Sequence, residues 1–337
     1  MEKWVIAAKR ADFQKIAQTF HIDPVTARLI RNRDVVGMEE MEKYLHGDLS
    51  LLPSPWRMKD MEKAVDILEE KIRQSRKIRV IGDYDIDGVM ASYILLRGLR
   101  CLGAAADVMI PHRITDGYGI NESLIEKAAK DQVDTIVTCD NGIAAAGQIG
   151  RAKELGMTVI VTDHHEVPYR EEGGERLEFL PPADAVINPK QRSCGYPFKL
   201  LCGAAVAACL ICALYDRFSV DPAEKEALLE YEAIATIGDV MDLVGDNRIL
   251  VKEGLKRLHH TENYGLQALC EVNALTADQI TPYHIGFVLG PCLNASGRLD
   301  TARKALQLLW AKTKEEARHA TDTASAYFNV SNLNKQI

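Results

Sequence analysis

The spacing of apolar residues changes near residue 75, where a helical pattern gives way to a series of short strands. Between residues 58 and 74 apolar side chains recur every three or four positions, which is typical of an amphipathic helix. Later segments are short, rich in β-branched residues and almost continuously apolar, as buried parallel strands are. These segments are residues 77–82, 107–111, 135–139, 158–162 and 185–188.

Helical stretches separate these predicted strands, at residues 90–102, 122–131 and 144–155. Crossovers of this length allow parallel pairing, so the pattern predicts an α/β fold with a doubly wound, mainly parallel sheet. In the preceding region, Asp23-Pro24 is typical of a capped helix start. We therefore expect a helical N-terminal region at 1–56, an α/β domain at 57–300 and a helical extension at 301–337.

Composition describes an ordinary globular protein of 337 residues, 47% of them hydrophobic. The formal net charge of −7 does not suggest a nucleic-acid-binding protein, although basic residues can concentrate on one face. Cys209 and Cys212 lie in an apolar, alanine-rich stretch, which favours core packing of reduced thiols over a disulfide or a zinc site. A charged N-terminus and the lack of an apolar run of about 18 residues predict a cytoplasmic protein with no membrane segment.

Acidic side chains gather where the predicted strands end. In open parallel sheets, ligands bind beyond the carboxyl ends of the strands. A single acidic residue at such a position can have a purely structural role, because an aspartate before a glycine is often a turn residue or a helix cap. Their coincidence at several strand ends instead predicts a divalent metal site. The residues are Asp83, Asp85 and Asp87 after the first strand, Asp140 after the third, Asp163-His164-His165 after the fourth, and Asp239 at the end of a later helix.

A set of carboxylates with a minority of imidazole favours Mn(II) or Mg(II) over zinc and calcium, and manganese is the preferred prediction. One carboxylate between two ions can bridge metals about 3.5–4 Å apart, an arrangement that stabilises the charge developing on a phosphoryl group. The site therefore suggests phosphoester hydrolysis. Neither a P-loop nor a G-x-S-x-G motif occurs in the sequence, so nucleoside triphosphate turnover and serine-hydrolase chemistry have no support.

These motifs resemble those of the DHH phosphoesterase superfamily, which is named for the sequence at Asp163-His164-His165. Within it the chain is similar to the RecJ family of exonucleases specific for single-stranded DNA. The likeness spans residues 60–300, so 57–300 would be the DHH catalytic domain. The matching segments are residues 83–88, 111–113, 116–119, 137–143, 187–189, 202–207 and 290–299.

The resemblance implies a role for each residue and two metal ions per site. Asp140 would bridge the ions, and His165 would face the scissile phosphate. A hydroxide activated by the two ions would release mononucleotides from the 5′ end of single-stranded DNA, in DNA repair and recombination. The ligand sets would be Asp87, His164 and Asp239 for one ion, and Asp85 with Asp83 for the other.

Contacts to DNA are expected from Arg113, His165, Asn294 and Arg298. Arg298 would stand ahead of a helix that begins near residue 301, where a helix N-terminus favours anions; the competing interpretation is a glycine loop needed only for packing. The sequence departs from the family pattern at Asp242, an extra carboxylate that we expect either to be solvated or to lie just behind the metal ligands.

RecJ proteins continue into further domains, so residues 301–337 resemble a linker toward a second domain and the chain resembles the catalytic half of a longer protein. Single-strand-binding protein and a helicase are candidate partners besides single-stranded DNA. Two alternatives stay open. One is a DHH phosphodiesterase for short oligonucleotides or nucleoside bisphosphates, and the other is a non-catalytic DHH scaffold in replication or repair.

Overall fold

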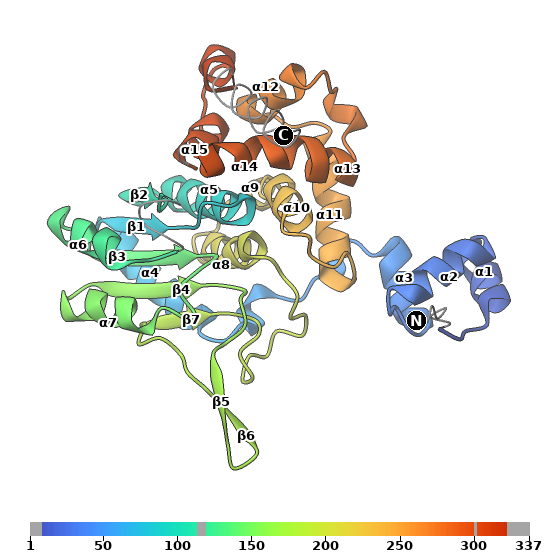
Figure 1. The fold of residues 1–337 in the computed structure, drawn as a ribbon, viewed down its shortest axis with the longest axis horizontal. Coiled ribbons are helices and arrows are strands. Elements are labelled where there is room, and N and C mark those ends of the chain that lie inside the picture. Colours follow the sequence, from blue (N-terminus) through green and yellow to red (C-terminus); the bar gives the residue numbers. More distant parts are fainter. Residues whose placement is uncertain (1–8, 113–118, 300–301, 322–337) are drawn as a thin grey trace, which may run out of the picture.

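The structure is a computed structural model that describes residues 9–112, 119–299 and 302–321. At the centre of these ranges lies a parallel sheet of five strands in the order β2-β1-β3-β4-β7 (Figure 1). The predicted strands are confirmed to within about two residues at each end, and so is the doubly wound α/β class. The strands are β1 (Ile78–Ile81), β2 (Ala106–Met109), β3 (Thr135–Cys139), β4 (Thr158–Thr162) and β7 (Ala185–Ile187).

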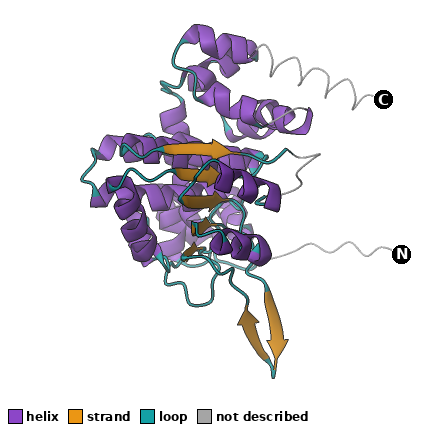
Figure 2. Ribbon diagram, turned by 90° about the vertical axis from the view of Figure 1, so that its left-hand side faces the viewer, coloured by secondary structure: helices purple, strands orange, loops and turns teal. Residues whose placement is uncertain are grey.

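Helices cover both faces of the sheet because alternate side chains of each strand point to opposite sides (Figure 2). On β1, Val80 joins a core shared with α4, α5 and α8, whereas Ile81 joins a second core shared with α6 and α7. Both faces are therefore apolar, which explains the continuous hydrophobic runs. The helices are α4 (Met61–Arg73), α5 (Ile86–Cys101), α6 (Glu122–Lys130), α7 (Ala146–Glu154) and α8 (Gly203–Arg217).

The strand order places a natural binding position at one edge of the sheet. After β1 the chain moves outward to β2 and then returns to β3 on the other side of β1. In doubly wound sheets, ligands bind beyond the carboxyl ends of the strands where the order reverses in this way. The loops that follow β1 and β3 meet at that position.

The N-terminal helices form a small unit with its own core, set apart from the sheet in Figure 1. Asp23 caps α2 by accepting hydrogen bonds from the backbone N–H groups of Val25 and Thr26, both at 2.9 Å, which confirms the predicted helix start. Two short turns then lead to α4. The elements are α1 (Phe13–Phe20), α2 (Pro24–Asn32), α3 (Met38–His46), η1 (Leu49–Leu51) and η2 (Pro55–Arg57).

After α8 the described chain is helical and packs on the α5 side of the sheet (Figure 1). The interpretation of residues 290–299 as a loop before a helix is wrong, because they form α14 (Gly290–Leu299) and the next helix begins only at Arg303. Arg298 thus belongs to a helix. The other elements are α9 (Pro222–Glu226), α10 (Leu229–Gly238), α11 (Gly245–Leu258), α12 (Tyr264–Val272), η3 (Ala277–Gln279), α13 (Pro282–His284), η4 (Ile285–Leu289) and α15 (Arg303–Leu309).

The sequence patterns did not predict an antiparallel hairpin, β5 (Tyr169–Glu172) and β6 (Glu175–Glu178), which extends from the sheet between β4 and β7 (Figure 1). Gly173 and Gly174 form its two-residue turn with φ of 63° and 85°, a conformation that glycine adopts readily. In the described ranges, no helix is both long and apolar enough to cross a membrane.

Candidate metal centre

The loop after β1 carries three aspartates whose positions follow from the start of α5. Asp85 caps this helix, its Oδ1 accepting the backbone N–H of Gly88 at 2.9 Å. Gly88 allows the helix to begin so close to the strand, because a Cβ at this position would lie 2.6 Å from the carbonyl oxygen of Asp83. Asp87 then falls in the first turn of α5 and is buried.

The N-terminus of α8 holds the carboxylate of Asp87. The backbone N–H of Gly203 donates to Oδ2 at 2.6 Å, and that of Ala204 donates to Oδ1 at 2.7 Å. A helix N-terminus favours an anion, so this contact fixes the orientation of Asp87. Gly203 also allows close approach to Asp140, since a Cβ there would lie 2.7 Å from the Cβ of Asp140.

Asp140 follows β3 in the left-handed conformation, with φ of 58°. Left-handed backbone is uncommon for a residue other than glycine, and the surrounding structure must hold it in place. The next residue does this. The amide nitrogen of Asn141 donates to the carbonyl oxygens of Ile81 at 3.1 Å and Cys139 at 2.8 Å, and its Oδ1 accepts the N–H of Ile120 at 3.2 Å.

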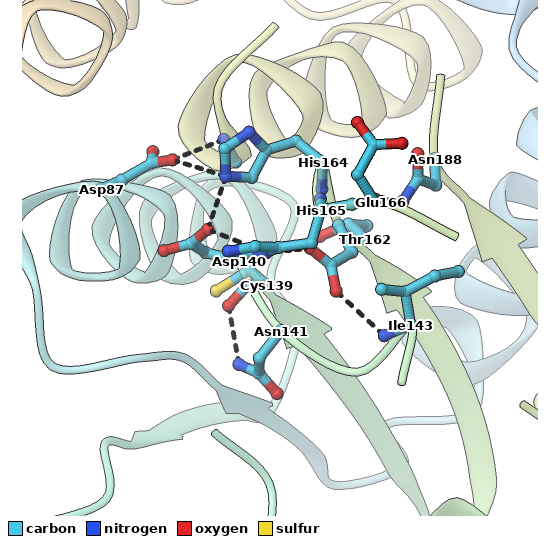
Figure 3. Close-up of polar contacts among 12 residues, drawn as sticks. Asp87, Cys139, Asp140, Asn141, Ile143, Thr162, His164, His165, Glu166 and Asn188 are labelled. Atoms are coloured by element: carbon cyan, nitrogen blue, oxygen red, sulfur yellow. Dashed lines mark hydrogen bonds and ion pairs between the residues drawn. The ribbon is translucent and has the colours of Figure 1, made fainter. Parts of the chain in front are cut away.

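His164 lies among three carboxylates, two of which, Asp87 and Asp140, are drawn in Figure 3. Its Nε2 is 3.1 Å from Oδ1 of Asp140, 3.6 Å from Oδ2 of Asp87 and 3.7 Å from Oδ2 of Asp239. Its Nδ1 lies 3.1 Å from the carbonyl oxygen of Leu201, which can only accept, so Nδ1 carries the proton and Nε2 presents a lone pair to the cluster. Burial, and then the neighbouring His165, lower the pKa of His164 to about 4.

Asp163 has a different role from the other acids, because its carboxylate is used for internal hydrogen bonds. Oδ2 accepts the N–H of Ile143 at 2.9 Å, and Oδ1 accepts the N–H groups of His164 at 2.7 Å and His165 at 3.0 Å. Burial would raise the pKa of Asp163, but the hydrogen bonds, above all that with the His165 side chain, lower it below the ordinary value.

The side chain of His165 is oriented by that carboxylate. Its Nδ1 lies 2.8 Å from Oδ1 of Asp163, and its side chain is 45% exposed, whereas that of His164 is 8% exposed. The hydrogen bond to Asp163 raises the pKa of His165. Asn188 fixes the backbone here by donating from its amide nitrogen to the carbonyl oxygen of His165 at 2.9 Å. The hydrogen bond at Nδ1 therefore fixes the direction in which the imidazole ring of His165 points.

Potential ligand atoms fall into three groups among the described residues, each with its atoms within 4.8 Å of one another. Asp140 belongs to two of the groups, and so does His164. The structure therefore brings together every metal ligand expected from the sequence, while the role of each residue as a ligand and the ion held by each group stay predictions. The groups are Asp87, His164 and Asp239; Asp83, Asp85 and Asp140; and Asp140, His164 and His165.

Without a cation the cluster holds its carboxylates at an energetic cost. Burial, followed by the charge of nearby carboxylates, raises the pKa of Asp83 to about 7, of Asp87 to about 8 and of Asp239 to about 6. The pKa of Asp140 also lies well above its ordinary value, for the same reasons. Oδ2 of Asp83 is buried and has no hydrogen-bond partner among the described residues. This donor set fits Mn(II) or Mg(II), whose positive charge would relieve the repulsion.

The expected DNA contacts are less completely described. Arg113 lies outside the described residues. Asn294 and Arg298 belong to α14, but the side chain of Arg298 is not described. Oδ1 of Asn294 is buried and has no hydrogen-bond partner within the described chain. Asp242 is exposed, which agrees with the solvated alternative, and belongs to none of the three ligand groups.

Sequence reasoning missed the residues that support the cluster. Asn141 had a local signal, because it directly follows an aspartate at a strand end. Asn188 and Gly203 lie in two of the segments that match the family, 187–189 and 202–207, but the sequence assigned neither a role. The carbonyl oxygen of Leu201 carries no side-chain signature. These groups reach the centre through tertiary contacts across 23 to 116 residues of sequence.

The parallel sheet and its acidic centre define a protein of the DHH class, and residues 77–236 match the sequence profile of the DHH family, N-terminal domain. The chain is 36% identical over 316 residues to the single-stranded-DNA-specific exonuclease RecJ of Bacillus subtilis strain 168. That match covers 94% of this chain and 38% of the relative.

Solved structures give the same result. A crystal structure of exonuclease RecJ bound to manganese matches with a TM-score of 0.73 and 34% identity, over 85% of this chain and 68% of that one. RecJ from Thermus thermophilus in complex with Mn²⁺ matches with a TM-score of 0.78 and 30% identity, over 95% and 44% of the two chains. The chain belongs to the RecJ family of DHH proteins. It spans 38% to 51% of the length of the curated relatives from Bacillus subtilis, Salmonella typhimurium and Escherichia coli.

Proposed function

We propose that this chain is the catalytic part of a metal-dependent exonuclease that hydrolyses phosphodiester bonds in single-stranded DNA from the 5′ end. One observation carries the proposal: two groups of candidate ligands lie side by side at the carboxyl ends of β3 and β4. Asp140 belongs to one group and His164 to the other, and Oδ1 of Asp140 lies 3.1 Å from Nε2 of His164. The curated relatives that match are named as exonucleases specific for single-stranded DNA, which favours this function over cleavage of short oligonucleotides or a scaffold role.

We propose two divalent ions per site, with Mn(II) preferred and Mg(II) possible. Related RecJ structures contain manganese or magnesium, which supports a divalent ion here. Asp140 would lie between the ions. When bound, they would supply an activated water and neutralise charge on the phosphate. The ligands would be Asp87, His164 and Asp239 for one ion, and Asp83, Asp85 and Asp140 for the other.

His165 would contact the scissile phosphate. Its ring is oriented by the hydrogen bond between Nδ1 and Asp163. Its Nε2 would donate a hydrogen bond to a non-bridging or leaving oxygen of the phosphate. The raised pKa of His165 keeps that proton available nearer neutral pH. His164 would differ, because its lowered pKa and its contact with Leu201 keep Nε2 unprotonated toward the carboxylates.

The remaining parts of the proposal concern DNA binding and the longer protein. The DNA strand would be bound by Arg113, Asn294 and Arg298. Single-strand-binding protein and a helicase are proposed partners in DNA repair and recombination.

We propose a helical N-terminal region at 1–56, the catalytic domain at 57–300 and a linker at 301–337. The isolated chain would bind metal but degrade DNA poorly, and processive 5′-to-3′ digestion by the chain alone would contradict this.

Replacing Asp140 by asparagine in the intact protein tests the function. Asp140→Asn removes the charge shared by two ligand groups, so we expect loss of bound Mn(II) and at least a hundredfold loss of nuclease activity on 5′-labelled single strands. Asp242→Asn is the matched control, because Asp242 is exposed and lies outside the ligand groups. Full metal content and activity in Asp140→Asn would exclude the bridging role.

A further inference from the structure

A cavity of about 290 Å³ lies between α8, α10, α11 and the connector that follows α3. Its walls are mostly apolar and include Leu52, Ala208 and Leu250. None of the described metal-ligand groups contributes a side chain to it, although Leu201, whose carbonyl oxygen contacts His164, is part of its wall. Since a cavity of about 150 Å³ can hold benzene, this volume suits a ligand of roughly ten non-hydrogen atoms.

One acidic side chain from α10 lines this cavity without a partner. Glu232 is 5% exposed, and no hydrogen bond or ion pair holds it among the described residues. Burial raises its pKa to about 8. Buried carboxyl groups in proteins are almost always hydrogen-bonded, because leaving one unpaired costs the free energy of its lost hydration. The carboxylate oxygens of Glu232 are not fully enclosed, so a ligand in the cavity that brings a hydrogen-bond donor would reach them.

The charge of the lining favours a cation. Asp216, Glu226 and Glu232 contribute three acidic groups and Lys225 one basic group, and Lys225 already pairs with Asp216. Burial raises the pKa of Cys212 to about 12, so its thiol adds uncharged, polarisable surface. Among the described residues, no basic side chain forms an ion pair with Glu232. A positively charged ligand group would therefore not compete with a protein cation for its carboxylate.

We propose that this cavity binds a small organic cation, a primary amine carried on an aromatic or short aliphatic body. The ammonium group would donate hydrogen bonds to the carboxylate of Glu232, and the apolar body would lie against Leu52, Ala208 and Leu250. The site rests on the cavity alone and not on the proposed nuclease activity. It adjoins α8 and α10, the helices whose ends carry Gly203 and Asp239 at the metal centre.

Benzylamine and toluene are suitable probes, because they share a ring of the right size and differ in the ammonium group. Each is titrated into the chain at pH 8.5 and followed by ligand-observed NMR, with wild type and Glu232→Gln compared. We expect Glu232→Gln to weaken benzylamine binding at least fivefold and to leave toluene binding unchanged. Equal affinity of the two proteins for benzylamine, or no binding to wild type, would overturn the proposal.

A second variant locates the bound probe. Cys212→Leu adds volume to the cavity wall and leaves Glu232 intact, so it should remove binding of both probes. Thermal melting of each variant confirms that it is folded, and Glu232→Gln is expected to melt no lower than wild type, because it removes a buried acid. Unchanged benzylamine binding in a folded Cys212→Leu protein would place the probe elsewhere and refute the assignment.

Discussion

Replacing Gly203 by alanine tests how closely α8 must approach the acidic cluster. The added Cβ would lie 2.7 Å from the Cβ of Asp140 and 2.8 Å from its Oδ1. Ordinary contacts of a Cβ begin near 3.4 Å, so the two elements must separate by about 0.7 Å (3.4 minus 2.7). Asp140 cannot simply rotate away, because its own Cβ and Cα are among the atoms in conflict.

The same displacement weakens two hydrogen bonds. The N–H groups of Gly203 and Ala204 donate to Asp87 at 2.6 and 2.7 Å, and a shift of this size along those bonds would lengthen both beyond 3.2 Å. Losing groups that orient a metal ligand typically lowers metal affinity tenfold to a hundredfold. Overpacking a tight contact costs about 1–3 kcal/mol of stability. Gly203→Ala should therefore bind Mn(II) about tenfold to a hundredfold more weakly and unfold at lower temperature.

Gly147→Ala provides the matched control. Gly147 lies in the first turn of α7, and a Cβ there would meet nothing within 4 Å. Because alanine favours a helix over glycine, this variant should be unchanged or more stable by about 0.5–1 kcal/mol. Mn(II) binding is measured by titration calorimetry, and stability by urea unfolding with a chelator present. Wild-type Mn(II) affinity in Gly203→Ala would refute the claim that this close approach positions the ligands.

Two other predictions follow from the electrostatics of the site. Asp163→Asn replaces the carboxylate that orients His165 and raises its pKa, so the variant should lower the pKa of His165. An unchanged NMR titration of His165 would contradict this. The raised pKa values of Asp83, Asp87 and Asp239 mean that the metal-free folded state keeps protons that the unfolded state releases above about pH 4. The stability of the metal-free protein should fall as the pH rises toward 8, and Mn(II) should raise the melting temperature more at pH 8 than at pH 6. If the protein with a chelator present melts at a higher temperature at pH 8 than at pH 6, this reasoning is wrong.

The sheet was predictable because strands that are buried on both faces have a recognisable sequence pattern. Strands such as β3 and β4 are covered on both faces, so their residues are apolar or β-branched and none of them is charged. The β5–β6 hairpin leaves no such trace, because both of its faces are largely exposed and its residues are mostly charged. In residues 290–299, glycine, proline and serine suggested a loop. Packing overrides that local preference, since Gly290 allows the chain to pass close to Ile86, where a Cβ would lie 3.3 Å from the Ile86 side chain.

The candidate ligands were predictable for a related reason. They follow the strands directly, and the carboxyl ends of parallel strands meet at one edge of the sheet. The sequence does not record which group holds each ligand in place. Asp87 depends on the N-terminus of α8, 116 residues further along, and His164 depends on the carbonyl oxygen of Leu201. Both contacts exist only because α8 packs against α5 in the folded protein.

The arrangement of helix ends explains how the fold tolerates so many buried acids. Asp85 caps α5, and Asp87 accepts two N–H groups from the start of α8, so two helix N-termini contact the acidic loop. Each supplies about half a positive charge, which compensates only part of the negative charge. The pKa of Asp87 still rises to about 8, because burial outweighs these hydrogen bonds. The protein thus fixes the ligand directions in advance and leaves an excess of negative charge, which divalent cations would neutralise.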